Sequence, residues 1–463
     1  AATISPDGDV FFTGVTTATT FTGAHSGSGA NLTNLPAANL TGTLPAISGA
    51  NLTGIAATDN VRTGILDVAG IATFRNDVNI GAAVTISESG IEASGIGITC
   101  ANINGTQIGG RRNLIFNGAM NVAQRGTSST SDGYATVDRF QVSYGGADEA
   151  PTQAQVDVSS GTTPYTLGFR KALKITNGNQ TGGAGTGDRL RYIYKVEAQD
   201  IASSGWNYIS SSSFITLSFW IKSSVAQNFY GRLQTEDGTA RNYPYETGSL
   251  TADTWTKIIK TIPGNTSPTL AFDNDNGTGL IIEPVIAWYG TDYTGSMSLN
   301  TWATYSDRTP DFGAAMDDWY LTNDATLEIT GVQLEVGPQA TAFEHRSFGE
   351  ERLLCQRYYQ DIASSSDLVM FGSGRASGTN NALVNTPLSV PLRASPTISQ
   401  TNYSTWGTEG SHTVSNTTPT VQYFHTNNTF LPMNFHSSAS LTNARVATVS
   451  SNSGSSLIMD AEL

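Results

Sequence analysis

The chain has 463 residues, which is too long for one hydrophobic core and predicts two or three domains. Charged residues make up only 13% of the sequence and Gly occurs 48 times, a composition that favours strands and turns over long helices. The formal net charge of −14 argues against nucleic acids and anionic membrane surfaces as partners, because phosphate groups bind to clusters of basic residues.

The sequence shows no signature of a disulfide, a zinc site, a transmembrane helix or a secretory signal. Cys100 and Cys355 lie in segments of different texture, so a structural disulfide is not expected. No Cys and His spacing indicates a zinc site, and no run approaches the roughly 18 apolar residues of a transmembrane helix. Ala1 does not head a secretory signal, and the missing initiator Met indicates a fragment or a processed form. We expect no cofactor and no membrane insertion.

Residues 1–112 carry short repeats that suit one strand and one turn each. The repeats are Phe-Thr-Gly at 12–14 and 21–23, and Ala-Asn-Leu-Thr at 30–33, 38–41 and 50–53. Each unit buries too little apolar surface to form a core in a single chain. We therefore expect a homotrimeric β shaft wound around a shared axis, continued by the alternating Val78, Ile80, Val84 and Ile86. The alternative is a disordered Gly/Ser/Thr linker, which rarely contains so many Ile and Val residues.

Residues 113–348 have the texture of a globular β-domain and contain six of the seven tryptophans. Apolar residues alternate at Ile215, Leu217, Phe219 and Ile221, which indicates one buried face of a strand. Further strands are expected at 190–196, 280–289 and 327–336, the last with a bulge at Gly331. Strands separated by Gly, Asn and Asp turns, without a βαβ rhythm, predict an antiparallel jelly-roll sandwich.

Residues 349–463 are expected to form a short helix followed by a second, smaller β-domain. The helix is predicted at 346–360, where Glu, Leu, Gln and Arg tolerate helical geometry. Apolar alternation at Leu388, Val390 and Leu392 indicates a strand in the domain that follows. The predicted fold class is all-β throughout.

Several motifs at the borders of these segments are more specific than the composition. In chain order they are NLIFNGAMNVAQRG at 113–126, DRF at 138–140, TLSFWIKS at 216–223, ITGVQLEVG at 329–337, ATAFEHRSFGEE at 340–351, CQRYY at 355–359, VPLRASPT at 390–397 and DAEL at 460–463. Their ordered succession resembles bacteriophage tail fibre proteins that carry a jelly-roll domain akin to carbohydrate-binding modules.

The resemblance implies a homotrimeric receptor-binding fibre of a phage virion, an extracellular particle. Its N-terminal end would join phage tail or baseplate proteins, and its C-terminal tip would contact a glycan or a protein of the host surface. A neck or whisker fibre with a scaffolding role only is the structural alternative. The family varies its tip, so the tip ligand does not carry over from the resemblance.

Catalysis is not expected, because no local signature of an active site is present. No G-x-S-x-G turn lies between a strand and a helix. A glycosidase needs two facing carboxylates, and spacing in sequence does not show convergence of the candidates, which are Asp273, Asp275, Glu283, Asp317 and Asp318. A tailspike-like glycan hydrolase is kept as the enzyme alternative.

Two features of the sequence bear on metal binding. Residues 273–277 alternate Asp and Asn before Gly as a calcium loop does, but they lack a distal bidentate Glu, so an Asx turn is the better interpretation. The sequence does not decide whether the domain binds a structural calcium ion. His412, His425 and His436 are widely spaced, which favours strand faces over a metal site.

Polar residues at the exit of the 327–336 strand are expected to satisfy backbone groups between domains. They are Gln333, Glu335, Glu344, His345 and Arg346. We interpret His345 as a hydrogen-bonded linker residue and not as a base.

The candidate receptor- or carbohydrate-binding residues are four side chains in the C-terminal domain, Tyr403, Trp406, Tyr423 and His425. Rings beside Asn, Ser and Thr offer apolar faces to sugar C–H groups while neighbouring amides and hydroxyls pair with sugar hydroxyls. The alternative is that these rings belong to the core or to the trimer interface, and for Phe424 this alternative is favoured.

Overall fold

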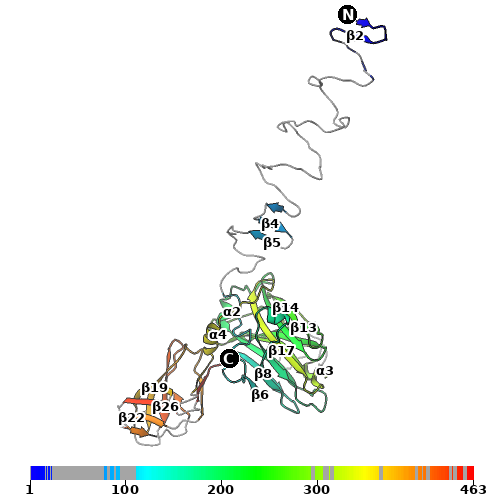
Figure 1. Cartoon of the computed structure of the whole chain (residues 1–463). Coiled ribbons are helices and arrows are strands. Elements are labelled where there is room, and N and C mark those ends of the chain that lie inside the picture. Colours follow the sequence, from blue (N-terminus) through cyan, green and yellow to red (C-terminus); the bar gives the residue numbers. More distant parts are fainter. Residues whose placement is uncertain are drawn as a thin grey trace. The chain divides into compact units, whose positions relative to one another are not determined.

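The structure is a computed structural model that describes most of the chain after residue 110 and short stretches before it. The described residues are 2–15, 17, 19–20, 22, 78–80, 84–87, 90–93, 111–293, 298–305, 312, 317–363, 369–401, 405–408, 410–412, 418–436, 441, 446–451 and 456–463. The chain divides into two compact units, residues 1–97 and 98–463 (Figure 1). In the part of the chain that is described, no helix is both long and apolar enough to cross a membrane.

The described residues of the first unit form two small antiparallel sheets. β1 (Ala2–Ile4) pairs with β2 (Val10–Phe12), and β3 (Val78–Ile80), β4 (Val84–Ser87) and β5 (Gly90–Ala93) form a three-stranded sheet. The alternating Val78, Ile80, Val84 and Ile86 thus lie on β3 and β4, and the trimeric shaft they were expected to continue stays a prediction. The hairpin leaves its large apolar side chains exposed, namely Ile4, Val10, Phe11 and Phe12. The repeats at 30–33, 38–41 and 50–53 lie outside the described residues.

The second unit begins with two six-stranded antiparallel sheets. The first sheet contains, in spatial order, β16 (Ala303–Thr304), β13 (Arg241–Ser249), β12 (Asn228–Thr235), β15 (Thr278–Tyr289), β10 (Arg189–Glu197) and β7 (Phe140–Gly145). The second contains β14 (Thr256–Pro263), β11 (Phe214–Ser223), β17 (Thr326–Val336), β9 (Lys171–Thr176), β8 (Thr152–Asp157) and β6 (Ser128–Ser129). Short helices lie between strands: α1 (Thr163–Thr166), α2 (Ala198–Ala202), η3 (Thr291–Tyr293) and α3 (Asp317–Tyr320).

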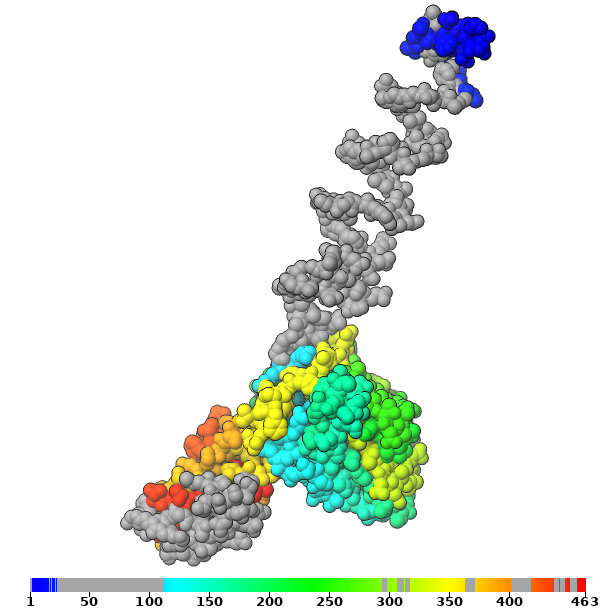
Figure 2. All heavy atoms as spheres, in the orientation of Figure 1, coloured from blue at the N-terminus to red at the C-terminus, as the bar shows by residue number. Residues whose placement is uncertain are grey.

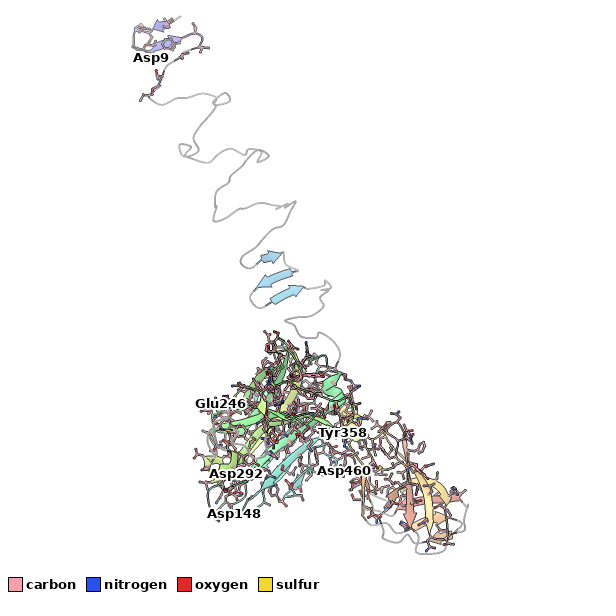
Figure 3. The ribbon with its side chains drawn as sticks, turned by 180° about the vertical axis from the view of Figure 1, so that it is seen from behind. Asp9, Asp148, Glu246, Asp292, Tyr358 and Asp460 are labelled. Atoms are coloured by element: carbon pink, nitrogen blue, oxygen red, sulfur yellow. The ribbon has the colours of Figure 1, made fainter. Side chains whose placement is uncertain are left out.

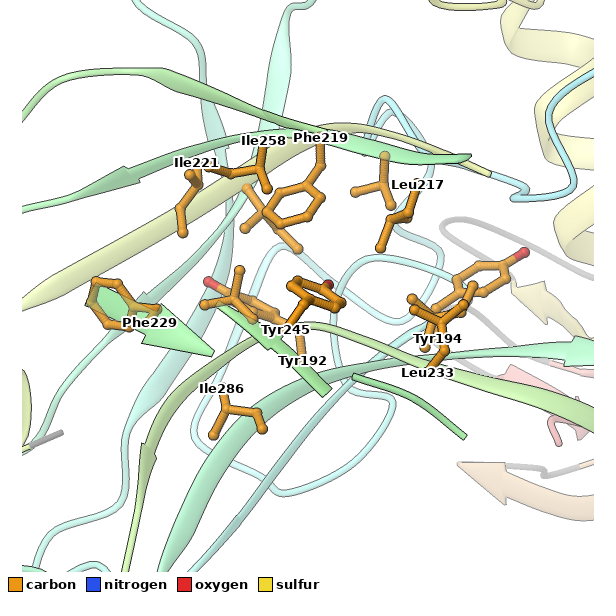
Figure 4. Close-up of a cluster of buried hydrophobic side chains, with 14 of the residues drawn as sticks. Tyr192, Tyr194, Leu217, Phe219, Ile221, Phe229, Leu233, Tyr245, Ile258 and Ile286 are labelled. Atoms are coloured by element: carbon orange, nitrogen blue, oxygen red, sulfur yellow. The ribbon is translucent and has the colours of Figure 1, made fainter. Parts of the chain in front are cut away.

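The core of this domain is one apolar layer between the two sheets. Figure 4 shows Leu217, Phe219 and Ile221 of β11 on one side of the layer and Tyr192 and Tyr194 of β10 on the other, all fully buried. These are the residues whose period of two predicted buried strand faces. Full burial of each such side chain contributes roughly 1.5–3 kcal/mol, so the layer is the main source of stability. The predicted antiparallel sandwich is confirmed.

The predicted bulge in the strand at 327–336 is also confirmed. The register between β11 and β17 shifts between Ser218 and Trp220, and Gly331 has φ +63°. A Cβ atom at Gly331 would lie 2.6 Å from Cζ of Phe169. Both the positive φ and the ring therefore require glycine at this position.

The remaining residues form α4 (Phe348–Gln356) and two further antiparallel sheets. One sheet contains β18 (Tyr359–Ala363), β27 (Ser456–Asp460) and β21 (Thr397–Thr401). The other contains β23 (Gly410–His412), β22 (Thr405–Thr408), β26 (Val446–Ser451), β19 (Val369–Ala376), β20 (Asn381–Pro387), β25 (Phe430–His436) and β24 (Thr420–Val421). The helix predicted at 346–360 is confirmed in a shorter form, capped by Ser347, whose hydroxyl accepts a hydrogen bond from the Glu350 N–H at 3.3 Å.

One strand predicted in this domain is wrong. Residues 388–392 follow the end of β20 at Pro387 and have no strand pairing. Leu388 and Leu392 are nevertheless buried, so their alternation arises from a loop packed on the core. Pro391 has no backbone N–H to contribute to a ladder.

Arg139 joins the sandwich to the C-terminal segment. Its side chain is 1% exposed, its guanidinium carbon lies 3.4 Å from the centroid of the Tyr358 ring, and it donates to the carboxylate of Glu462. Arg125 adds ion pairs to Asp460 at 3.2 Å and to Glu462 at 3.4 Å. Figure 3 labels Tyr358 and Asp460, which lie close together at this junction. We call Arg125, Arg139, Asp460 and Glu462 the arginine clasp.

Polar side chains after β17 hydrogen-bond to backbone groups at the start of the sandwich, as the sequence predicts. Glu344 accepts from the backbone N–H of Arg112 at 2.6 Å and of Asn113 at 2.8 Å. Arg346 donates to Asn113 O at 2.6 Å and is paired with Glu351 at 3.0 Å. In Figure 2 the yellow residues around α4 lie against the cyan segment that opens the sandwich. The expectation that these side chains satisfy backbone groups is confirmed.

Candidate functional site

A polar groove of about 260 Å³ lies on the outward face of the first sheet. On β10 the even-numbered residues from 190 to 196 are buried in the core, so Arg191, Ile193 and Lys195 point to the other face. Residues of β7, β12, β15 and the segment after β16 complete the lining: Gln141, Ser143, Arg232, Gln234, Ile281, Glu283 and Tyr305. We call this site the sheet groove.

Glu283 and two arginines form the floor of the sheet groove. Arg232 is opposite Glu283 in the register of β12 and β15 and donates to it from Nε and from one terminal nitrogen, both at 3.0 Å. Arg191 donates to the same carboxylate at 2.7 Å. Burial opposes ionisation of Glu283, which is 2% exposed, but the guanidinium groups of Arg191 and Arg232 outweigh it and hold its pKa below the ordinary value. The floor is therefore a fixed, charged frame.

An aromatic ring forms one wall of the sheet groove. Tyr305 follows β16, and its backbone N–H donates to Ala240 O at 2.9 Å. The Tyr305 ring centroid lies 5.4 Å from the guanidinium carbon of Arg232, a distance at which cation and ring attract each other. The site thus combines a ring with a planar array of hydrogen-bond donors.

The last residues of the chain border the sheet groove. Lys195, which lines it, donates from Nζ to Leu463 O at 2.7 Å. Burial lowers the pKa of the Lys195 ammonium, against the opposing charges of Glu236 and Glu462. The neighbouring Gln234 side chain donates to Glu236. Arg139 of the arginine clasp donates to Lys195 O at 2.6 Å, so the groove and the clasp are connected through Lys195.

The chemistry of the sheet groove suits the binding of a saccharide. Sugar rings present hydroxyl groups to fixed polar partners and C–H faces to apolar or aromatic surfaces, and the groove offers both through its arginines and through Ile193, Ile281 and Tyr305. Among the described lining residues Glu283 is the one carboxylate.

Comparisons with known proteins give distant similarities in fold. A protein from Bacteroides thetaiotaomicron described as sugar-binding has 14% identity and a TM-score of 0.28 over 48% of this chain and 99% of that one. A family 11 carbohydrate-binding module from Clostridium thermocellum has 14% identity and a TM-score of 0.21 over 47% of this chain and 98% of the module. The enzymatically active domain of tailspike protein 4 from bacteriophage CBA120 has 11% identity and a TM-score of 0.24 over 48% of this chain and 21% of that one.

No family model and no curated protein matches the sequence. The structural matches include carbohydrate-binding modules and a tailspike domain, and nothing in them is specific to tail fibres. Membership of the tail fibre family therefore stays a prediction.

The four binding residues predicted in the C-terminal domain stay predictions as well. Tyr403 lies outside the described residues, and Trp406 lies on β22 with its side chain outside the description. Tyr423 and His425 lie between β24 and β25, and both are exposed, Tyr423 by 67%. Phe424 packs against the core of the C-terminal domain, which confirms the interpretation of that ring as a core residue.

The carboxylates considered for a glycosidase lie in three separate segments of the chain. Glu283 is in the sheet groove, Asp317 and Asp318 begin α3, and Asp273 and Asp275 precede β15. The Gly277 N–H donates to Asp275 Oδ1 at 2.8 Å, which confirms the predicted Asx turn. Among the described residues no group of three or more His, Cys, Asp or Glu side chains is arranged for a metal ion.

His345, which the sequence predicts to be a hydrogen-bonded linker residue, has a backbone partner. His345 Nε2 lies 2.9 Å from Leu167 O, so its interpretation as a hydrogen-bonded residue is confirmed. Cys355 is a free, buried thiol, and Cys100 lies outside the described residues.

Sequence reasoning missed most of the sheet groove. The sequence assigns no role to Arg191, Arg232 or Tyr305, and it offers Glu283 as a candidate acid, whereas the structure shows an ion-paired carboxylate. A usable signal was present at 190–196, where the strand whose inner face was recognised carries Arg191 and Lys195 at the alternate positions. Cations on the outer face of a strand are common on any surface, however.

Proposed function

We propose that this protein is a structural subunit of a phage tail fibre that adheres to the bacterial surface, and that the sheet groove binds a saccharide of that surface. The observation that carries the binding function is the groove floor, where Glu283 pairs with Arg191 and Arg232 and the Tyr305 ring lies near the Arg232 guanidinium. The tail fibre part rests on the ordered motifs at 113–463. Under this proposal the protein belongs to the virion, is not an enzyme, and contacts tail or baseplate proteins with its N-terminal end.

A second candidate places the receptor contact on the C-terminal domain, as the sequence predicted. The exposure of Tyr423 and His425 favours it. A host outer-surface protein would suit such a surface as well as a glycan would. Scaffolding alone, as in a neck or whisker fibre, and a tailspike-like hydrolase are the remaining alternatives.

The two binding candidates are separated by one pair of matched variants. Tyr305→Ala removes the ring over the sheet groove and is expected to weaken binding to glycans on an array of bacterial surface polysaccharides about tenfold. Tyr423→Ala removes an exposed ring of the C-terminal domain and is expected to leave this binding unchanged. Calorimetry with the best array glycan measures both.

The reverse result, with loss in Tyr423→Ala alone, would move the site to the C-terminal domain. No retained glycan would favour scaffolding, and new reducing ends in the same incubation would favour the hydrolase. Deleting the residues after Asp361 is a poorer test, because it also removes Glu462, which pairs with Arg139 of the sandwich.

Assembly as a homotrimer is part of the proposal. The exposed apolar hairpin of β1 and β2 and the exposed Phe348 and Leu353 on α4 support contacts between copies. Light scattering of the full chain is expected to give three times the mass of one chain. A folded monomer across the micromolar range would contradict the shaft. Three copies would strengthen weak single-site binding through avidity.

A further inference from the structure

A second hollow lies on the outward face of the other sheet of the sandwich. It has a volume of about 210 Å³. Ser218 and Trp220 of β11 line it, and they alternate with the core residues Leu217 and Phe219 on the other face of the strand. Trp220 is opposite Lys257 of β14 in the register. We call this site the ring cleft. The sheet groove lies on the first sheet, so the two sites are on opposite faces of the sandwich.

Three rings fix one wall of the ring cleft. Phe169 and Phe343 meet edge to face with centroids 4.9 Å apart, and His345 lies 4.9 Å from Phe343 and 5.2 Å from Phe169. The hydrogen bond between His345 Nε2 and Leu167 O holds the imidazole in place. The bulge at Gly331 leaves the space that the Phe169 ring occupies. The wall is therefore packed and preformed.

Two polar groups of the ring cleft have no partner in the described chain. Ser218 is 3% exposed, and its hydroxyl makes no hydrogen bond to any described residue. Lys257 is exposed and forms no ion pair with the residues that the structure describes. By contrast, the nearby Lys222 is paired with Glu328 at 3.0 Å. A hydroxyl without a hydrogen-bond partner and an unpaired cation, both lining an aromatic hollow, are features of a ligand site.

The size and chemistry of the ring cleft restrict its ligand. Its volume of about 210 Å³ is below the roughly 300–1,000 Å³ of sites for drug-sized ligands, so it suits a single ring. The aromatic wall suits the C–H face of a pyranose, Ser218 suits a sugar hydroxyl, and Lys257 suits an anionic substituent. We propose that the ring cleft binds one carboxylate-bearing pyranose, a uronic acid unit of a surface polysaccharide.

The test is a titration of the full chain with D-glucuronate and with D-glucose, followed by calorimetry and saturation-transfer NMR. D-Glucuronate is expected to bind more tightly than D-glucose. Lys257→Gln is expected to lower the affinity for D-glucuronate about tenfold and to abolish the preference over D-glucose. Ser218→Ala is expected to weaken both sugars. Lys174→Gln, on β9 of the same sheet and outside the ring cleft, is the matched control and is expected to change neither affinity.

The sheet groove provides the second control. Tyr305→Ala is expected to leave D-glucuronate binding unchanged, so loss of binding in that variant would assign the sugar to the groove and overturn the inference. Equal affinities for the two sugars, or an unchanged D-glucuronate affinity in Lys257→Gln, would overturn it as well. Lys257 is exposed, so its substitution is not expected to disturb folding.

Discussion

The Glu283→Ala variant is expected to have a free energy of unfolding about 3–5 kcal/mol smaller than the unchanged protein. The substitution leaves Arg232, which is 2% exposed, and Arg191 without the carboxylate that pairs them. Removing one member of a buried ion pair leaves an uncompensated charge, which costs more than the pair itself contributes. Chemical denaturation at one protein concentration measures the change.

The neighbouring Glu236→Gln substitution is the control for this prediction. Glu236 is an exposed carboxylate next to β12, so its substitution is expected to change the free energy of unfolding by less than about 0.5 kcal/mol. Equal effects of the two substitutions would show that Glu283 is not the anchor of the groove floor. Glu283→Ala is also expected to lose saccharide binding, since Arg191 and Arg232 would no longer be held in place.

The same group gives the protein an acid-sensitive component of stability. The pKa of Glu283 is lowered in the folded state because Arg191 and Arg232 outweigh the effect of burial. A lowered folded pKa means that the contribution is fully present above the ordinary value of 4.5 and is lost as the pH falls through the folded pKa. The melting temperature of Glu283→Gln is therefore expected to fall less steeply below this pH than that of the unchanged protein.

The strands and their buried faces could be predicted from the sequence, because period-two alternation depends on neighbouring residues only. The face of β11 at Leu217 and Phe219 and the bulge at Gly331 are examples. The same local signal failed at 388–392, where buried leucines in a loop mimic a strand. Burial alone does not specify backbone pairing.

The binding sites could not be predicted, because they depend on which strands become neighbours. Arg232 and Glu283 are 51 residues apart and meet only because β12 lies beside β15 in the sheet. The ring cleft likewise needs the segment after β17 to fold over β11, which brings Phe343 near Trp220. In the sequence each of these residues is indistinguishable from an ordinary surface or core residue.

Arg139→Ala is expected to separate the unfolding of the sandwich from that of the C-terminal domain. Arg139 is buried between the Tyr358 ring and Glu462, so its removal leaves the carboxylate of Glu462, which is 5% exposed, with the longer contact to Arg125 at 3.4 Å. The loss is expected to be about 3–5 kcal/mol. Scanning calorimetry is expected to replace one cooperative transition by two, with the C-terminal domain unfolding at the lower temperature.

The arginine clasp is tested as a unit by a double-mutant cycle. Glu462→Ala is expected to resemble Arg139→Ala, and the double variant is expected to be little worse than either, because the two side chains stabilise the same contact. Arg352→Ala, an exposed arginine on α4, is the matched control and is expected to keep a single transition. Additive losses in the double variant would mean that Arg139 acts mainly through its stacking on Tyr358. In that case Glu462 would hold the C-terminal segment through Arg125 instead, and Lys195 at the edge of the sheet groove would keep its contact with Leu463.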